Sequence, residues 1–528
     1  MKVSTMQGVS RRSFLGGAAL GLGALAVGGL AGCAPQSAGS ASSNSGASAA
    51  DVSWDGEYDV VVCGGGGGGL TAAYSALENG AESVIVLEKA AQCGGTTALA
   101  EGAVQAAGTS WQQEAGVTDD TPDLLFQYWQ TDAEGLVDDE LIRVMADNAA
   151  DNVQWMADSF GITFANVFGA YPTPYLDKAC LKDRIHLIAD AADPSKTGGV
   201  VWTTNAQAAI EEKGGEIKLN AEATELVMGE DGVAGVATAD GEHYKANKGV
   251  VMAMAGIEHN EELAKRYNPQ HYWDLTTQNV LTAPTNTGDG IVMGMAVGAQ
   301  TVFHGCVDLL LQTWSYTNNQ NPEIPYILVD MRGNRFVRED TTYAFHCRAI
   351  FNAAMQEGGA AGATYMIMDS KMTASDSVCA WSDNAEGGAA AREAALADGS
   401  LVQADSLEAL AEAIGVPAAG LAFTVEKWNA DCAAGFDSVY GREKQLTALD
   451  TAPFYAWKTV NSNIGSIGGV RINTDAAVLD EAGDPIPHLF GAGVNTAGWI
   501  GPYYPGSGTC LQGTLNWGRI AGKNAASA

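Results

Sequence analysis

The stretch "YDVVVCGGGGGGLTAAYSALENG", residues 58–80, constrains the fold more than any other part of the chain. An apolar, β-branched run precedes six consecutive glycines, and apolar residues at helical spacing follow them up to Gly80. Glycine loses more conformational freedom on ordering than any other residue, so this run needs a physical reason. "ESVIVLEK" (82–89) then predicts a second buried strand. The order strand, glycine turn, helix, strand predicts an α/β fold with a Rossmann-like parallel sheet.

The glycines occupy the places of a dinucleotide-binding loop. Gly64, Gly66 and Gly69 fill the pattern G-x-G-x-x-G, which allows a tight turn, a close approach of pyrophosphate and close packing of helix on strand. The helix that follows directs backbone N–H groups and its positive dipole end at the phosphates. Glu88 ends the second strand, where a carboxylate binds ribose hydroxyls. We predict a dinucleotide site here, against the alternative of a glycine-rich loop without a ligand.

Composition excludes several classes of protein. The chain has 528 residues and 46% hydrophobic residues, enough for two or more domains with sizeable cores. Its net charge of -34 argues against nucleic acid as a partner, because acidic surfaces repel phosphates. The nine cysteines form no CxxC or CxxCH motif. We therefore expect no zinc site, no c-type haem, no iron–sulfur cluster and no other metal site.

The first 33 residues resemble an export signal. "SRRSFL" (10–15) places two arginines before a stretch rich in Gly, Ala and Leu, as in twin-arginine signals, although a Sec signal also has a basic start. "LAGC" (30–33) resembles a lipobox with Cys33 as the lipidated residue, but small residues also suit ordinary processing. Residues 34–51 predict a flexible linker. We expect export, with membrane contact only through the signal or a lipid anchor.

Four further segments identify the dinucleotide. "EKAAQCGGTTALAEGAV" (88–104) has Gly-Gly-Thr-Thr after the acidic residue, where NAD dehydrogenases continue into another amphipathic helix. "GVVMAMAG" (249–256) and "HLFGAGVNTAG" (488–498) are apolar runs that end in small residues, and "NTGDGIVMGMAVGA" (286–299) predicts a helix after Thr-Gly-Asp-Gly. Here the chain resembles the fumarate reductase/succinate dehydrogenase flavoprotein superfamily, most closely its 3-ketosteroid dehydrogenase-like branch.

The resemblance implies FAD as the cofactor. It places cofactor contacts at Gly64, Gly66, Gly68, Gly69, Glu88, Lys89, Gly94, Gly95, Thr96, Thr97, Gly102, Gly256, Asp289, Gly493, Gly508, Thr509 and Leu511. Some succinate dehydrogenases link the flavin covalently to a histidine near the Gly-Gly-Thr-Thr loop. No histidine lies between Glu88 and Gly108, so we expect the FAD to be bound non-covalently.

The resemblance also implies a divided domain. An FAD-binding domain takes residues 52–300 and 462–528, and an inserted α+β capping domain that closes over the flavin takes residues 301–461. Within the first part, we predict two helices between Thr121 and Gly161 and a β-meander over 216–246.

Two stretches are expected to meet at the flavin. In "VDMRGNRFVREDTTYAFH" (329–346), "GNRF" and Glu339 match the cap motif, which implies a catalytic role for Glu339. Tyr343 stands where fumarate reductases have a proton-donating arginine. Ketosteroid dehydrogenases carry a catalytic tyrosine there, and a phenol acts as acid or base once neighbours lower its pKa. The alternative is that Tyr343 only packs in the cap. Arg335 is expected to make a structural ion pair.

The second stretch is "GWIGPYYPGSGTCLQGTLNWGR" (498–519). Its "YPGSGT" resembles the signature in which a tyrosine and a glycine N–H polarise the ketone of the substrate. Tyr504 and Gly508 take these places, with Tyr503 as a second choice, and such donors stabilise a developing enolate. The alternative is that this segment contacts only the flavin.

Carboxylate-binding residues of the fumarate reductases are replaced in this chain. Tyr343 and Tyr504 stand at two arginine positions, and "NIGSIGGVRI" (463–472) has glycine and serine where those enzymes have a histidine. A dicarboxylate substrate is therefore not expected. Tyr171 and Tyr175 are candidates for a further phenol in the site.

We expect an exported FAD oxidoreductase that acts on a CH–CH bond next to a carbonyl, in a neutral enone or an aromatic or steroid-like substrate. Hydride would pass at flavin N5 while a tyrosine handles the proton. A separate protein would donate or accept the electrons. The alternatives are a respiratory reductase of a carboxylate, similar to fumarate reductase, and a non-catalytic flavin-binding lipoprotein.

Overall fold

The computed structural model describes residues 49–50, 52–169, 176–277, 279–310, 326–374, 381–384 and 387–528. The predicted leader with Cys33, and the candidate phenols Tyr171 and Tyr175, lie outside these residues. None of the described helices is both long and apolar enough to cross a membrane.

The main sheet confirms the predicted α/β class. Its order is β17-β18-β9-β1-β2-β6, and β1 pairs in parallel with both β2 and β9. The central strands are apolar and buried over residues 60–63 of β1, 84–87 of β2 and 250–252 of β9, as expected for parallel strands covered on both faces. The strands are β1 (Gly56–Cys63), β2 (Val84–Glu88), β6 (Glu216–Leu219), β9 (His243–Met252), β17 (Ala477–Leu479) and β18 (Pro485–Gly491).

The predicted meander over 216–246 forms only in part. β7 (Ala223–Met228), β8 (Val233–Thr238) and β9 are antiparallel neighbours, as predicted. β6, in contrast, leaves the meander and pairs in parallel with β2 at the edge of the main sheet. The turn signals locate the chain reversals, but they do not determine which strand a short segment joins.

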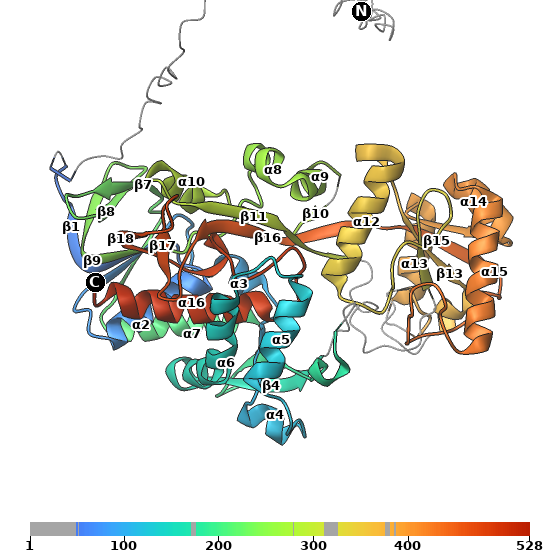
Figure 1. The fold of residues 1–528 in the computed structure, drawn as a ribbon, viewed down its shortest axis with the longest axis horizontal. Coiled ribbons are helices and arrows are strands. Elements are labelled where there is room, and N and C mark those ends of the chain that lie inside the picture. The colour runs from blue at the N-terminus through green and yellow to red at the C-terminus, as the bar shows by residue number, and fades with distance from the viewer. Residues whose placement is uncertain are drawn as a thin grey trace, which may run out of the picture. The chain divides into compact units, whose positions relative to one another are not determined.

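Helices lie against the main sheet and beside one another. In Figure 1, α2 (Gly67–Glu78) and α16 (Thr509–Ala525) lie side by side, although the chain between them is more than 400 residues long. The two helices predicted between Thr121 and Gly161 are present, and Gly161 ends the second one in a left-handed conformation. The other helices of this part are α3 (Gly95–Leu99), α4 (Ser110–Glu114), α5 (Pro122–Asp132), α6 (Asp139–Phe160), α7 (Gly199–Glu212), α8 (Glu261–Tyr267), α9 (Pro269–Thr277) and α10 (Asp289–Ala296).

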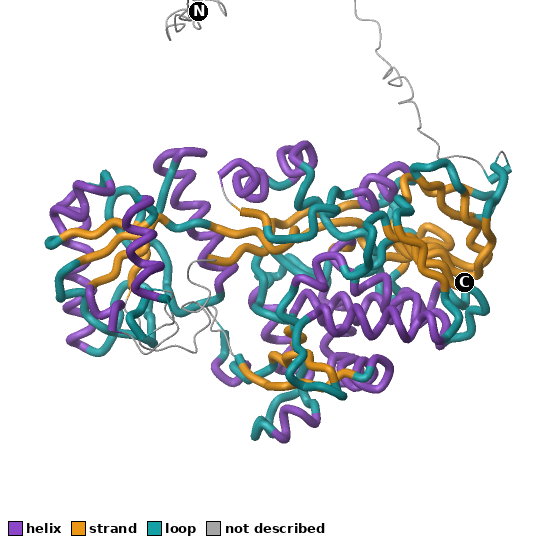
Figure 2. The backbone as a smooth tube through the Cα atoms, turned by 180° about the vertical axis from the view of Figure 1, so that it is seen from behind, coloured by secondary structure: helices purple, strands orange, loops and turns teal. Residues whose placement is uncertain are grey.

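Two long antiparallel strands lead from this part toward the segment predicted as the cap. β11 (Thr301–Leu310) pairs with β16 (Asn461–Arg471), and Figures 1 and 2 show this ribbon running toward α12 (Tyr343–Gly358). β10 (Asn279–Val280) and β19 (Thr496–Ala497) pair with β16. A separate antiparallel sheet joins β3 (Ala103–Gln105), β5 (Ile185–Asp190) and β4 (Ile162–Phe168).

Residues 326–458 contain a four-stranded antiparallel sheet with apolar clusters of its own. Side chains alternate along β12, so Tyr326 and Leu328 join a cluster with α12, while Ile327 and Val329 join a cluster with α14 and α15. Helices therefore cover both faces of this sheet. Its elements are β12 (Tyr326–Val329), β13 (Tyr365–Asp369), β14 (Leu401–Ala404), β15 (Phe454–Lys458), α13 (Gly388–Asp398), α14 (Leu407–Ile414) and α15 (Ala418–Ala434). The predicted domain boundaries stay predictions.

Candidate active site

The glycine run forms the turn between β1 and α2. Gly64 has φ +102°, and a Cβ there would lie 2.3 Å from the carbonyl oxygen of Ala253. A Cβ on Gly69 would lie 1.8 Å from the carbonyl oxygen of Gly64, so this position serves the packing of helix on strand. Gly64, Gly66 and Gly68 line a cavity, which we name the dinucleotide cavity. The glycine run therefore leaves backbone without side chains on the cavity wall at the start of α2.

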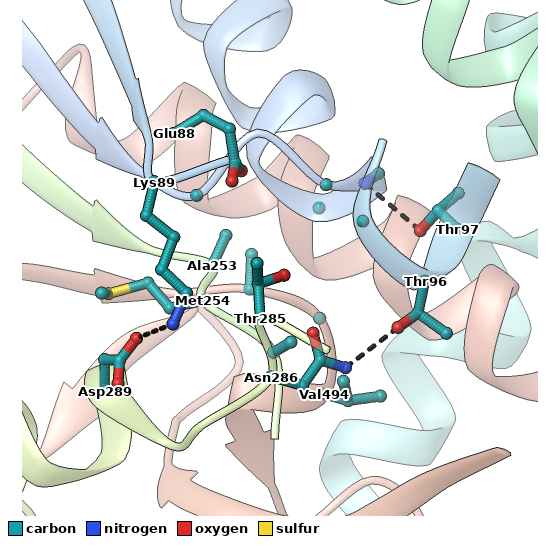
Figure 3. A pocket seen from close by; sticks show the side chains of 18 of the residues that line it. Glu88, Lys89, Thr96, Thr97, Ala253, Met254, Thr285, Asn286, Asp289 and Val494 are labelled. Carbon is teal, nitrogen blue, oxygen red and sulfur yellow. Dashed lines mark hydrogen bonds and ion pairs between the residues drawn. The ribbon is translucent and has the colours of Figure 1, made fainter. Parts of the chain in front are cut away.

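Figure 3 shows how side chains from distant segments line this cavity. The Glu88 carboxylate accepts hydrogen bonds from the N–H groups of Gly65 and Ala90, each at 2.7 Å. Lys89 Nζ lies 2.5 Å from Asp289 Oδ2, although the two residues are 200 positions apart. Lys89 and Asp289, both predicted as cofactor contacts, line the dinucleotide cavity, and their ion pair ties the end of β2 to the start of α10.

The Gly-Gly-Thr-Thr loop connects this cavity to a second one. Thr97 Oγ1 accepts from Gly67 N–H at 3.2 Å, and Thr96 Oγ1 accepts from the Asn286 side chain at 2.9 Å. The second cavity, which we name the tyrosine cavity, has a volume of about 500 Å³. The two cavities share walls made by Thr96, Thr97, Asn286, Val494 and Thr514. One extended ligand with a phosphate-bearing half and a planar half fits this continuous site.

Tyr343 and Tyr504 meet in the tyrosine cavity. Tyr343 is the first residue of α12, and Tyr504 precedes α16, yet their ring centroids are 6.0 Å apart. The Tyr343 hydroxyl lies 3.3 Å from Ser507 Oγ, and the Tyr504 hydroxyl accepts from Cys510 N–H at 3.1 Å. The cavity walls also include Gly102, Gly508 and Leu511, three of the residues for which the sequence predicts cofactor contacts.

Burial controls the ionisation of Tyr504. Desolvation raises the pKa of this phenol well above its usual value, and the nearby Cys510 thiol adds to the effect. Backbone hydrogen bonds from Cys510 and Gly508 act in the opposite direction and do not cancel it. The phenol therefore stays protonated at neutral pH and is able to donate a hydrogen bond.

The described walls of the tyrosine cavity include acidic but no basic side chains. Among the described residues that line it, the acidic ones are Glu101 and Glu258, and no lysine, arginine or histidine is present. Glu258 is fully buried, and its Oε1 accepts from Ser466 N–H at 2.6 Å and from Ser466 Oγ at 2.8 Å. A carboxylate ligand would find no cationic partner on these walls.

Glu339 lies away from both cavities. Its Oε2 is 2.5 Å from Arg335 Nη2 and 3.4 Å from Arg442 Nη1, and all three side chains are almost fully buried. Arg335 also pairs with Asp437 at 3.0 Å, which confirms the structural ion pair predicted for Arg335. This geometry supports a positioning role for Glu339, four residues before Tyr343, in place of the predicted catalytic role.

Gly94, Thr509 and Gly256, which were also predicted as cofactor contacts, do not line either cavity. Gly94 immediately precedes α3, the Thr509 hydroxyl donates to the Gly506 carbonyl, and a Cβ on Gly256 would lie 2.0 Å from Ser466 Oγ. Gly95 and Gly493 line the dinucleotide cavity. Tyr503, the second choice, packs on Phe345 at 5.2 Å in a different cavity. Sequence reasoning missed Ser507 and Glu258; Ser507 lies inside the "YPGSGT" signature, whereas no motif indicated Glu258.

Comparison with known proteins agrees with this geometry. The FAD binding domain family matches residues 59–511. A digoxin reductase from Eggerthella lenta is 32% identical over 99% of this chain and 97% of its own length. A probable fumarate reductase from Shewanella frigidimarina is 30% identical over 88% of this chain and 74% of its own length.

Solved structures share the fold. The 3-ketosteroid-Δ4-(5α)-dehydrogenase from Rhodococcus jostii, solved with 4-androstene-3,17-dione, matches with a TM-score of 0.74 and 25% identity, over 91% of this chain and 99% of that one. Bare glycine backbone, an acidic residue at the end of β2 and a joined second cavity fit FAD. These observations confirm the predicted superfamily and cofactor, and the chain belongs to the FAD binding domain family of FAD-dependent oxidoreductases.

Proposed function

We propose that this protein reduces a carbon–carbon double bond next to a carbonyl in a neutral, largely apolar substrate. The carrying observation is the pair of buried phenols, 6.0 Å apart, in a cavity that shares its walls with the dinucleotide cavity and has no cation among its described lining residues. The similarity to a digoxin reductase over nearly the full length of both chains favours the reductive direction.

Each residue of the tyrosine cavity has a proposed task. The Tyr504 hydroxyl and the Gly508 N–H donate to the carbonyl oxygen, which polarises the alkene and stabilises the developing enolate. The Tyr343 hydroxyl gives its proton to the carbon next to the carbonyl, and Ser507, 3.3 Å away, orients that hydroxyl. FAD held in the dinucleotide cavity would, in its reduced form, supply the hydride that the other alkene carbon takes up. Two electrons and two protons then account for the saturated product.

The apolar part of the cavity supports the proposed substrate class. Leu99 and Leu281 line it and remain 63% and 40% exposed. Val307, Leu309 and Ile464 line it as well. A bulky neutral ring system would cover these side chains, whereas a small dicarboxylate would leave them exposed and its own charge unpaired.

A turnover assay with a reduced dye as electron donor tests this proposal. The panel contains cyclic enones, 3-oxo-steroids with a ring alkene, neutral enoate esters and fumarate. We expect oxidation of the dye with the neutral enones and none above background with fumarate. Robust turnover of fumarate would support the alternative respiratory reductase, and flavin binding without any turnover across the panel would support the non-catalytic alternative.

We further propose that the protein is exported by the twin-arginine route. Arg11 and Arg12 precede the apolar stretch, and this route carries folded proteins, which suits an enzyme that takes up FAD before export. The double variant Arg11→Lys and Arg12→Lys is expected to keep the FAD-loaded protein in the cytoplasm. An unchanged distribution would refute the proposal. Export would place the enzyme outside the cytoplasm, and we therefore also propose that a separate protein supplies its electrons there.

A further inference from the structure

A cluster of buried ligating side chains lies behind one wall of the tyrosine cavity. Val307 and Leu309 of β11 line the cavity, and successive side chains of a strand point to opposite faces. Cys306 and Asp308 therefore lie on the reverse face of β11, where they meet Asp274 of α9. Cys306 Sγ is 3.3 Å from Asp274 Oδ2 and 3.4 Å from Asp308 Oδ2. The mechanism proposed above uses none of these three groups.

The two carboxylates are buried beside a basic side chain. Asp274 and Asp308 are 0% and 1% exposed. No described lysine or arginine pairs with either of them, but the neighbouring His271 ring acts to lower the pKa of Asp308. Gln270 Nε2 donates to Asp308 Oδ2 at 2.5 Å, and Asn463 Nδ2 donates to Asp308 Oδ1 at 3.0 Å. Asp274 Oδ1 is buried without a hydrogen-bond partner. Buried charges of this kind are stable when they are neutralised or when they bind a metal.

A second buried amide of β16 also has an unsatisfied polar atom. Asn461 and Asn463 lie on the same face of β16, since they are two positions apart on one strand. The Asn461 side chain is fully buried and donates to the Cys347 carbonyl at 3.1 Å, but its Oδ1 has no partner. An amide oxygen in this state is costly to bury unless it accepts a hydrogen bond or contacts a cation.

The separations fit a tetrahedral metal. With Zn–S near 2.3 Å and Zn–O near 2.0 Å, a tetrahedral angle places sulfur and oxygen about 3.5 Å apart. The two observed sulfur–oxygen distances are 3.3 and 3.4 Å, and the ligand atoms of all three residues lie within 4.8 Å of one another. We propose that Asp274, Cys306 and Asp308 bind one zinc ion, with the fourth position open.

One thiolate and two carboxylates form a ligand set of sulfur and oxygen. This set suits zinc better than magnesium or calcium, because those two ions prefer oxygen ligands only. The ion would tie β11 to α9 and so hold Val307 and Leu309 in the wall of the tyrosine cavity. Spacing in the sequence gave no sign of this site, because Cys306 and Asp274 are 32 positions apart and on different elements. The inference does not depend on the proposed reaction.

Metal content of the purified full chain tests the inference. The protein is isolated without chelator, dialysed against zinc and then against buffer, and its zinc is measured by mass spectrometry beside its flavin. The variants are Asp274→Asn and Cys306→Ser. The control is Cys432→Ser, a half-buried thiol of α15. We expect roughly one zinc per chain in the parent and in the control, and about a tenth of that or less in both variants.

A second measurement covers variants that fail to fold. Added zinc is expected to raise the melting temperature of the metal-stripped parent and of Cys432→Ser, because a ligand that binds only the folded state stabilises it. If the parent contains no zinc and its melting temperature does not respond to zinc, the inference is wrong and the carboxyl pair shares a proton instead. Equal zinc in Cys306→Ser and the parent would also overturn it.

Discussion

Replacing Tyr343 by phenylalanine removes one hydroxyl from the tyrosine cavity and nothing else. The side chain is 1% exposed and its ring packs 6.0 Å from that of Tyr504, so the substituted ring keeps its place. Loss of the contact with Ser507 at 3.3 Å is expected to lower the free energy of unfolding by only about 0.5–1.5 kcal/mol. Loss of a general acid lowers the rate by about 10²–10⁴-fold, or about 3–5 kcal/mol in the barrier.

The matched control for this change is Tyr503→Phe. Tyr503 is the neighbour of Tyr504 in the chain, but it lines another cavity and packs on Phe345. Turnover of an enone with a reduced dye, the absorption spectrum of the bound flavin and incorporation of solvent deuterium into the product are measured for both variants. We expect Tyr343→Phe to keep its flavin and lose turnover, while Tyr503→Phe stays within a few fold of the parent. Near-parental turnover by Tyr343→Phe would assign the proton to another residue.

Five further outcomes are expected. Tyr504→Phe should slow turnover by about 10²–10³-fold, less for an electron-poor alkene, and equal losses for all alkenes would refute carbonyl polarisation. Because burial raises the pKa of Tyr504, the parent should show no loss of activity from its ionisation at pH 7–9, measured as a pH–rate profile. Fumarate and succinate should fail as substrates. FAD should leave the protein on acid precipitation, and yellow colour that stays in the pellet would show a covalent link. Glu339→Gln should lower the free energy of unfolding by roughly 3–5 kcal/mol, since Arg442 loses its buried carboxylate partner and Arg335 keeps only Asp437.

Local signals in the sequence predicted the FAD-binding part well. The apolar run, the glycines and the second predicted strand lie within about thirty residues of one another. In the structure these segments form β1, the turn, α2 and β2. Thr121 caps α5 through its side chain, as its position before a proline predicts. These features depend on neighbouring residues, so the sequence reveals them directly.

Features that depend on distant contacts were harder to predict. The motif placed Glu339 near the chemistry, but its partner Arg442 lies 103 positions away and draws the carboxylate into an ion network. β6 joins β2 because a sheet edge is available there, which no turn signal encodes. Glu258 faces the tyrosine cavity through its contact with Ser466, 208 positions away. Each of these outcomes depends on tertiary packing.

The most direct test of the central claim is a single turnover on the enzyme's own flavin. Bound FAD is reduced anaerobically and mixed with a cyclic enone or with fumarate in a stopped-flow spectrometer, and the return of the oxidised flavin spectrum is followed. We expect the neutral enone to reoxidise the flavin and to yield the saturated ketone, with no reoxidation by fumarate. Faster reoxidation by fumarate than by every neutral enone, or a folded protein that contains no flavin, would contradict the account.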